Sequence, residues 1–368
     1  MKREAGGVLL LVLVALVLVG ALVSAGWLVG LHELRVADTA AAPARALAAA
    51  EEGAWAQVGA WKSSQYGALP PGGALSFAGH AGGALGSFEG SVRRLSELLF
   101  LIESDGRDPD DRARQRIGLI VRLRPLDLSI RAALSASGSV SVAGGARLAG
   151  RDEPPAGWVC PPPGKTLPGL RLGKDAALEV DGCPGGRCVT GAPPVLVDSA
   201  AESFVRLVGV EIAALRAQAD KVIGPGLWVV GPSQVGGKCR YTAPSNWGDP
   251  DRPQGPCGEY LPLIFAHGDL RLHGGRGQGI LVVDGDLTVS GGFRFFGPVV
   301  VLGQFDTTGE GGHFRGGVVA ATVVVAQSTP VESLTVGYSS CAVRRAVVAQ
   351  GTPEAVPGRS WLRLHQIP

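Results

Sequence analysis

The chain opens with a long apolar run that carries no charge. Val8–Leu31 is 24 residues long, and at 1.5 Å per helical residue it would extend about 36 Å, enough to cross the hydrocarbon of a bilayer. Lys2 and Arg3 precede it, while Glu33 and Arg35 follow. Positive charge on the short end favours a cytoplasmic N-terminus. The pattern therefore predicts a single-pass membrane helix with the bulk of the protein exported.

The residues after this run keep a helical character. They are rich in alanine, a strong helix former, and Pro43 is the one interruption. Apolar side chains recur at helical spacing, at Leu34, Leu47, Ala50, Ala54 and Trp55. The sequence thus predicts one transmembrane and continuing helix over residues 8–62. A secretory signal cut after Ala25 is the competing interpretation, although the apolar run continues past that point to Leu31.

A second pattern, strict alternation, follows the helix. In "QRIGLIVRLRP" one parity holds Ile117, Leu119, Val121 and Leu123, and the arginines take the other. This is typical of a half-buried strand. Together with "FEGSVRRLSELLFLIESDG" and the turn-forming "DGRDPDD", it predicts an antiparallel hairpin. We expect residues 63–130 to form a small antiparallel β region.

Short alternating strands separated by glycine turns recur nearer the C-terminus. The triplets that begin at Gly268, Gly285 and Gly303 lie 17 and 18 residues apart. Such spacing predicts β-solenoid-like coils, in which each coil buries its apolar row against the next. We assign residues 267–350 to these coils, with 131–150 as a further coil, and expect Gly285 and Gly303 in tight turns. The fold class expected is α+β, a long N-terminal transmembrane helix followed by a β-rich exported domain.

Residues 151–266 read as an insert rich in cysteine and proline, with one helix over residues 199–223. A capping box of Ser199 and Glu202 would begin that helix. Its buried face would carry Phe204, Leu207, Val208, Leu215 and Val222.

The six cysteines predict disulfides. Because all of them follow the membrane helix, they would lie in an oxidising compartment, and none has the spacing of a zinc site. The closest local pair is in "CPGGRC", and a second pair would close the "NWGDPDRPQGP" loop. The candidates are Cys160, Cys183, Cys188, Cys239, Cys257 and Cys341.

Candidate chemistry is sparse. "CPPPGKT" lacks the first glycine of a phosphate-binding loop, and its prolines remove backbone N–H donors. His267, Asp269, Arg271 and His273 share one strand parity and favour a solvated outer face, and the Asp284 and Asp286 pair fits an ordinary turn. A net charge of +2 with no long basic run indicates no nucleic-acid partner. We expect a protein that is not an enzyme and needs no metal or cofactor.

The N-terminal region resembles PilX-type type IV pilus assembly proteins, a minor-pilin-like family. The resemblance covers about residues 1–60 and rests on the basic lead ending in "AGG", the uncharged helix, "LHELRVADTA" and "ARALAAAEEG". It implies that a prepilin peptidase removes a leader of residues 1–7 by cutting after Gly6 or Gly7. Major pilins carry a glutamate five residues after the cut, where this chain has Leu11 or Val12. That departure is compatible with a minor or initiating subunit.

The resemblance implies other pilin-like subunits, the assembly machinery, the inner membrane and the peptidase as partners. The protein could then reach a cell-surface pilus. Within the helix, the small residues Gly20, Ala21, Ser24 and Ala25 would permit close approach of neighbouring helices. Two other hypotheses stay open: a membrane-anchored surface adhesin without a filament role, and a secreted β-helix enzyme acting on carbohydrate through a groove near Asp284, Asp286 or His267.

Overall fold

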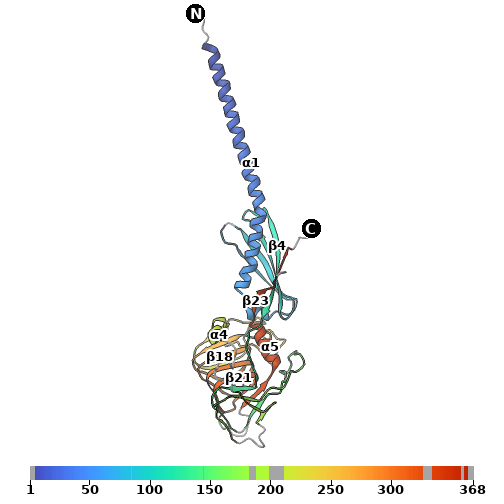
Figure 1. The fold of residues 1–368 in the computed structure, drawn as a ribbon, viewed down its shortest axis with the longest axis vertical. Coiled ribbons are helices and arrows are strands. Elements are labelled where there is room, and N and C mark those ends of the chain that lie inside the picture. Colours follow the sequence, from blue (N-terminus) through green and yellow to red (C-terminus); the bar gives the residue numbers. More distant parts are fainter. Residues whose placement is uncertain are drawn as a thin grey trace.

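The chain folds as a long apolar helix followed by a strand-rich part, so the α+β class is confirmed (Figure 1). The computed structural model describes residues 5–83, 85–143, 145–181, 188–198, 211–325, 334–357 and 360–363. Helix α1 spans Ala5–Gly59 and is 55 residues long, with Pro43 inside it. Its N-terminal half extends away from the rest of the molecule, and its C-terminal half lies on a small sheet (Figure 1).

The small sheet is antiparallel and has the strand order β1-β2-β3-β4-β23, with β24 also pairing with β4. A short helix, α2 (Ser63–Gly67), leads from α1 into it. The predicted hairpin is present as β3 and β4, and the apolar parity of β4 is buried. The strands are β1 (Ala74–His80), β2 (Ser87–Arg94), β3 (Leu99–Arg107), β4 (Arg114–Arg124), β23 (Thr352–Ala355) and β24 (Trp361–Arg363).

Small residues let α1 approach this sheet closely. Ala46, Ala49, Ala50 and Ala54 of the helix are fully buried. Opposite them, a Cβ added to Gly106 of β3 would lie 2.1 Å from the carbonyl oxygen of Ala46. Only glycine fits there, so the helix backbone rests almost directly on the strand.

Apart from one short separate pair, the remaining strands form a parallel stack inserted between two neighbours of the small sheet. The chain leaves the small sheet after β4 and returns to it at β23, the strand paired with β4. Within the described residues the stack contains 16 strands in one sheet. Strands of the first part are β5 (Leu134–Ala136), β6 (Val140–Val142), β7 (Ala146–Ala149), β8 (Leu170–Gly173), β9 (Leu178–Val180), β10 (Val189–Thr190) and β11 (Val195–Asp198). Strands of the second part are β12 (Lys221–Ile223), β13 (Gly226–Val230), β16 (Leu263–His267), β17 (Leu270–Gln278), β18 (Ile280–Asp284), β19 (Leu287–Ser290), β20 (Phe293–Thr307), β21 (Gly312–Val325) and β22 (Leu334–Tyr338).

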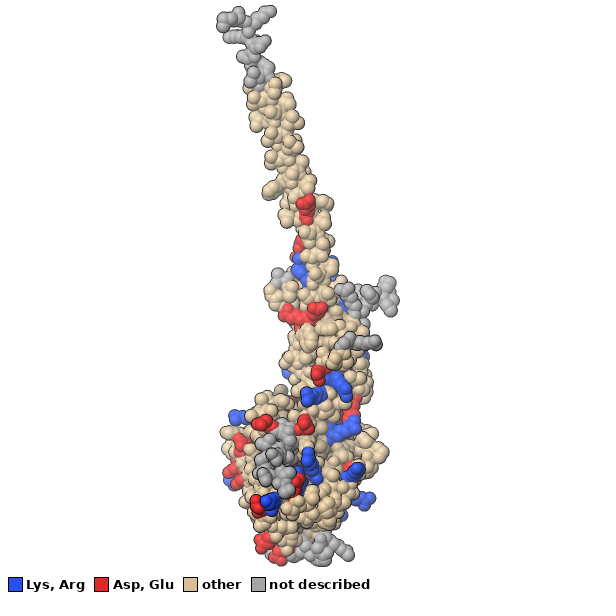
Figure 2. Space-filling model, in the orientation of Figure 1, with Lys and Arg blue, Asp and Glu red and all other residues tan. Residues whose placement is uncertain are grey.

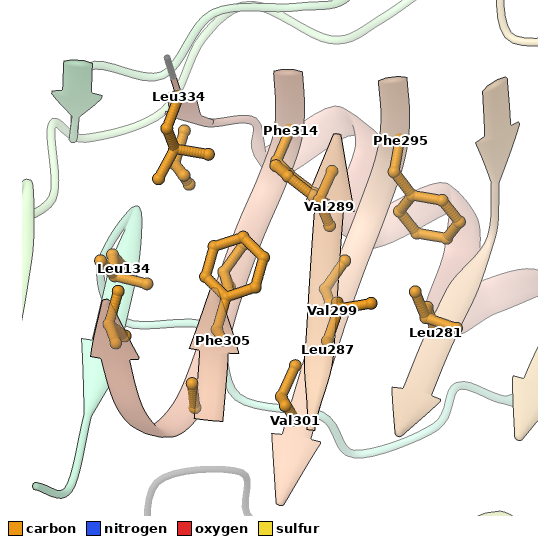
Figure 3. Close-up of a cluster of buried hydrophobic side chains, with 14 of the residues drawn as sticks. Leu134, Leu281, Leu287, Val289, Phe295, Val299, Val301, Phe305, Phe314 and Leu334 are labelled. Carbon is orange, nitrogen blue, oxygen red and sulfur yellow. The ribbon is translucent and has the colours of Figure 1, made fainter. Parts of the chain in front are cut away.

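Equivalent positions of successive strands pair at the intervals of the glycine triplets. Leu270 of β17 pairs with Leu287 of β19, which pairs with Phe305 of β20. Leu287 and Phe305 point into one core with side chains of neighbouring strands (Figure 3). Leu270 is buried in the same cluster. Parallel strands stacked in this register bury each apolar row against the next. The name β-solenoid stays our interpretation of the stack.

One of the two expected turn glycines lies elsewhere. Gly285 sits between β18 and β19 with φ of 156°, as expected. Gly303 instead lies within β20, beside the register shift between Val301 and Gln304. A Cβ at Gly303 would come 2.2 Å from Oδ1 of Asp286. Glycine is therefore needed there for the close approach of two coils rather than for a turn.

The segment assigned to an insert differs from the prediction. Residues 199–210, which include the expected capping box, lie outside the described residues. Helix α4 (Ile212–Gln218) buries Leu215 as expected, but Lys221–Ile223 is strand β12, and Val222 is 60% exposed. The expected helix end at 223 is therefore wrong, since parallel pairing of β12 with β16 replaces the last helical turn.

Two further differences concern which residues build each unit. Strands β8 to β13 come from the segment 151–266 and belong to the parallel stack, while β14 (Gln234–Val235) and β15 (Lys238–Cys239) form a separate short pair. Helix α5 (Ser340–Ala349) lies inside the range expected to be coils. It packs against β20 and β21 and buries Cys341, Ala342 and Ala346.

Candidate functional site: the protruding helix and its root

The exposed half of α1 is the most distinctive surface of the molecule. It is the one helix among the described residues that is long and apolar enough to cross a membrane, and none of that apolar window is buried. Leu22, for example, is 73% exposed. Figure 2 shows this half without charged side chains until the helix nears the sheet. Such apolar exposure is stable only inside a bilayer or against other apolar surfaces.

The four small residues of this half lie on α1 with open space around them. Gly20 and Ser24 are four residues apart and share a helix face, and Ser24 Oγ donates a hydrogen bond of 2.8 Å to the Gly20 carbonyl. A Cβ on Gly20 would meet nothing within 4 Å. Ala21 and Ala25 have the same spacing one position along. Helix packing through these residues stays a prediction.

The proposed processing site lies at the start of the same helix. Gly6 and Gly7 fall in the first turn of α1, which begins at Ala5. Cleavage there stays a prediction.

A cluster of charges holds the root of α1, just after the apolar half. Arg112, in the turn between β3 and β4, lies 2.6 Å from Asp38 of α1. Asp38 also pairs with Arg45 at 2.9 Å, and Arg45 lies 3.9 Å from the buried carboxylate of Asp108. The hydrogen bond from Arg112 holds the pKa of Asp38 below its ordinary value. We call Asp38, Arg45, Asp108 and Arg112 the root clasp. They connect α1, on both sides of Pro43, to the end of the small sheet.

The polar row on the parallel stack faces solvent, as its parity predicts. His267, Asp269, Arg271 and His273 are exposed, whereas Leu270 and Leu272 between them are buried. Asp269 accepts a hydrogen bond of 3.0 Å from the backbone N–H of Asp286, whose own carboxylate accepts one of 2.7 Å from the N–H of Gln304. Each of these two aspartates thus accepts a backbone hydrogen bond from the next coil along the stack.

His267 and Asp284 lie side by side on the surface of the parallel stack. His267 Nδ1 lies 3.4 Å from Asp284 Oδ2, and both side chains are open to solvent. No three His, Cys, Asp or Glu side chains are grouped to hold a metal ion in the part of the chain that is described. The arrangement is that of a single solvent-exposed contact between two polar side chains.

Lys221 is a polar residue that the sequence did not single out. It is buried, and its ammonium donates to the carbonyl oxygens of Tyr241 and Ala243 at 2.8 and 2.7 Å. Burial lowers the pKa of this amine. The two hydrogen bonds fix the loop that follows β15, so the role is structural. Lys221 lies within the predicted helix, so its sequence position gave no sign of burial.

The cysteines form disulfides in the described part of the chain. Cys239 pairs with Cys257, 18 residues on, and closes the loop expected from the sequence. Cys160 pairs with Cys341 of α5 across 181 residues, a pairing that sequence spacing did not indicate. Cys188 is also disulfide-bonded. Cys183 lies outside the described residues, so the local "CPGGRC" pair stays a prediction.

Comparison with known proteins adds only a distant structural likeness. No protein-family model matches the chain, and no curated protein matches it. Among solved structures it is similar to the competence-associated pilin ComZ from Thermus thermophilus, with 12% sequence identity and a TM-score of 0.24, over 88% of this chain and 98% of that one. At this TM-score the likeness carries no argument about this chain, and function must be argued from the residues themselves.

Proposed function

We propose that this protein is a minor-pilin-like structural subunit of a type IV pilus or a related secretion filament. The observation that carries the proposal is the continuity of α1. One helix presents a bare apolar half at its N-terminal end and packs buried alanines against the small sheet at the other. No linker separates the two halves, so one continuous helix joins the apolar half to the small sheet.

This construction suits a subunit that is first held in a membrane and then packed into a filament. In the inner membrane the apolar half is covered by lipid. On assembly, the same surface is covered by the helices of other pilin-like subunits, and the face of Gly20 and Ser24 permits close approach. The inserted parallel stack is then presented at the surface. The assembly machinery and a prepilin peptidase acting at Gly6 or Gly7 are the further partners that this function requires.

Sequencing the mature N-terminus tests the proposal. We expect a start at Gly7 or Val8, with the apolar half retained. A start at Gly26 would remove the packing helix and overturn the filament function. An intact Met1 would leave a plain anchor and favour the membrane-anchored adhesin.

Two variants sharpen this test. Replacing Gly6 and Gly7 together by leucine should block the cut. Gly20→Leu is the matched control, since it adds the same side chain within the helix where nothing lies within 4 Å, and it should leave the mature start unchanged.

Exchange of the anchor separates the filament subunit from the adhesin. Residues 8–31 would be replaced by an unrelated apolar span of the same length. A filament subunit should then stay in the membrane but fail to enter filaments, because its packing face is lost. An adhesin should keep its surface display and binding on the new anchor.

A further inference from the structure

A polar hollow lies on the outer surface of the parallel stack, where β7, β22 and β21 run side by side. The register places Arg147 of β7 opposite Thr335 of β22, and Thr335 opposite His313 of β21. The residue that follows each of these three is buried, so all three side chains point outward. The hollow has a volume of about 270 Å³ and is lined by Arg147, Ala149, Glu153, His313, Arg315, Thr335 and Gly337.

Two small residues lie between the polar side chains and leave room for the hollow. Gly337 pairs with Ala149 on one side and with Arg315 on the other. A Cβ at Gly337 would lie 2.7 Å from Nη1 of Arg315, so the arginine side chain lies across this glycine. The same Nη1 donates to Oε2 of Glu153 at 2.9 Å, and the Glu153 backbone N–H donates to the Tyr338 carbonyl oxygen. Arg315 is therefore held in place without a ligand.

The row of matched positions extends beyond the hollow, but its charges are neutralised there. On β20 and β17 the row continues as Arg294 and Arg276. Arg294 pairs with Asp251 at 2.6 Å, and Arg276 pairs with Asp249 at 3.0 Å. This part of the row therefore offers little attraction to an anion.

Inside the hollow, one positive charge has no counter-charge. Arg315 is paired with Glu153. Arg147 is exposed, and it forms no ion pair or side-chain hydrogen bond within the residues that the structure describes. The Thr335 hydroxyl lines the same hollow. A ligand that carries a single negative charge would balance the hollow.

We propose that this hollow binds a uronic acid unit of an acidic polysaccharide. Guanidinium groups present a planar fork that matches a carboxylate, so Arg147 and Arg315 would hold the acid group. The hydroxyls of the sugar ring can donate to Glu153 and accept from Thr335. The volume of about 270 Å³ lies just below the usual range of about 300–1,000 Å³ for small-molecule sites, which suits a single sugar ring.

Glu153 distinguishes a uronate from a small inorganic anion. Its carboxylate lies in the same hollow and would repel phosphate or sulfate, which concentrate their charge on one small centre. A uronate instead keeps its charge at one end of the ring and offers hydroxyls at the other. A nucleic-acid backbone also fits poorly, because its binding relies on several unpaired cations, whereas Arg276 and Arg294 are paired.

Titration calorimetry of the full chain in detergent micelles tests the site. The probes are trigalacturonate and triglucuronate, two acidic trisaccharides that differ in ring stereochemistry. The methyl ester of each is its matched control, because the ester keeps the sugar rings and removes the charge. We expect an acidic trisaccharide to bind at least about tenfold more tightly than its ester, since hydrogen bonds between charged groups are the strong ones.

Two variants locate the binding in the hollow. Arg147→Gln should weaken binding about tenfold or more. Arg271→Gln is the matched control, because Arg271 is an exposed strand arginine outside the hollow, and it should leave the affinity unchanged. Gly337→Ala should also weaken binding, since the new Cβ meets only the flexible side chain of Arg315 and displaces it. Circular dichroism confirms that each variant folds.

A third variant tests the discrimination against inorganic anions. In the wild type, inorganic phosphate should compete poorly with the acidic trisaccharide. Glu153→Gln removes the repelling charge and should let phosphate compete, while the trisaccharide still binds.

Failure of both acidic trisaccharides to bind, equal binding of their esters, or an unchanged affinity in Arg147→Gln would overturn the inference. Phosphate that displaces the trisaccharide from the wild type at a similar concentration would show a general anion site instead. Displacement by a short DNA duplex that depends on Arg147 would assign the hollow to nucleic acid. The hollow lies on the parallel stack and not on α1, and the mature N-terminus is independent of these results, so the proposed function can survive a failure here.

Discussion

Arg112 and Asp38 join the small sheet to α1 through a contact of 2.6 Å between a guanidinium nitrogen and a carboxylate oxygen. They are far apart in sequence, and one lies in a strand connection while the other lies on α1. Pro43 interrupts the hydrogen bonding of α1. The alanines that pack on the small sheet lie after Pro43, whereas Asp38 lies before it. The Arg112–Asp38 pair therefore holds the part of α1 that precedes the proline.

Arg112→Ala should therefore loosen the root of α1 without unfolding the sheet. We expect faster amide hydrogen exchange at residues 36–46, with exchange in β3 and β4 unchanged. Arg131→Ala, at an exposed arginine outside the root clasp, is the control and should leave exchange at the root unchanged. Equal exchange rates at residues 36–46 in both variants would show that the root clasp does not stabilise this part of α1.

The root clasp should also weaken in acid. Arg112 lowers the pKa of Asp38 in the folded protein below the ordinary value of 3.8, so the contribution is fully present above about pH 4 and is lost as pH falls through the folded pKa. The rate at which pepsin cleaves α1 near its root, divided by the rate for Arg112→Ala at the same pH, should be well below one at pH 4 and should rise toward one as the pH falls further. The variant at each pH corrects for the pH dependence of the protease itself. A ratio that does not change with pH would contradict this.

Gly106→Ala should destabilise the packing of α1 on the sheet. The new Cβ would lie 2.1 Å from the Ala46 carbonyl oxygen and 2.4 Å from the Ala50 nitrogen, both backbone atoms that cannot turn aside. We expect a loss of about 1–3 kcal/mol in the free energy of unfolding, measured by denaturant titration with tryptophan fluorescence. Gly59→Ala, where nothing lies within 4 Å, is the matched control and should not destabilise.

Asp286→Ala should destabilise the parallel stack by removing the acceptor for the Gln304 N–H. The expected loss is about 1 kcal/mol, and Asp286→Asn should recover most of it because its side-chain oxygen still accepts. Asp284→Ala is the control, since its contact is a solvent-exposed pair with His267. Equal melting temperatures for all three variants would exclude this capping role.

Native protein should contain no thiol open to alkylation in denaturant without reductant. The cysteines of the described residues are bonded, and peptide mapping should find Cys183 joined to Cys188. Mass spectrometry counts the labelled sites. Two or more labelled cysteines would show free thiols and would favour a metal-binding or redox role for them.

Local patterns predicted local structure well. The parity of Ile117, Leu119, Val121 and Leu123 identified β4 because one face of that strand is buried under α1 and its core. The parity of Leu270 and Leu272 succeeded for the same reason on the parallel stack. The loop closed by Cys239 and Cys257 was visible because both cysteines lie close in sequence.

Pairings between distant segments could not be predicted in this way. β8 pairs with β5 and β23 with β4, and neither strand is long enough to show a period. The helix expected to reach 223 ended at Gln218 because β12 gains parallel hydrogen bonds with β16, a tertiary contact that outweighs helix propensity. Among the candidate site residues, Asp269 was recognisable as part of a solvated strand face and Asp286 as a turn residue, but their hydrogen bonds depend on the register between coils.

The insertion of the parallel stack between β4 and β23 has a mechanical consequence. Because the chain enters and leaves the stack through two adjacent strands of one sheet, a pull on the stack loads both strands together. The small sheet lies between the stack and the protruding half of α1 (Figure 1), so tension between these two parts passes through the sheet. Because β4 and β23 are hydrogen-bonded to each other, force on the stack is shared between both strands. Two paired strands should resist a higher force than one strand that could be unzipped from the sheet alone.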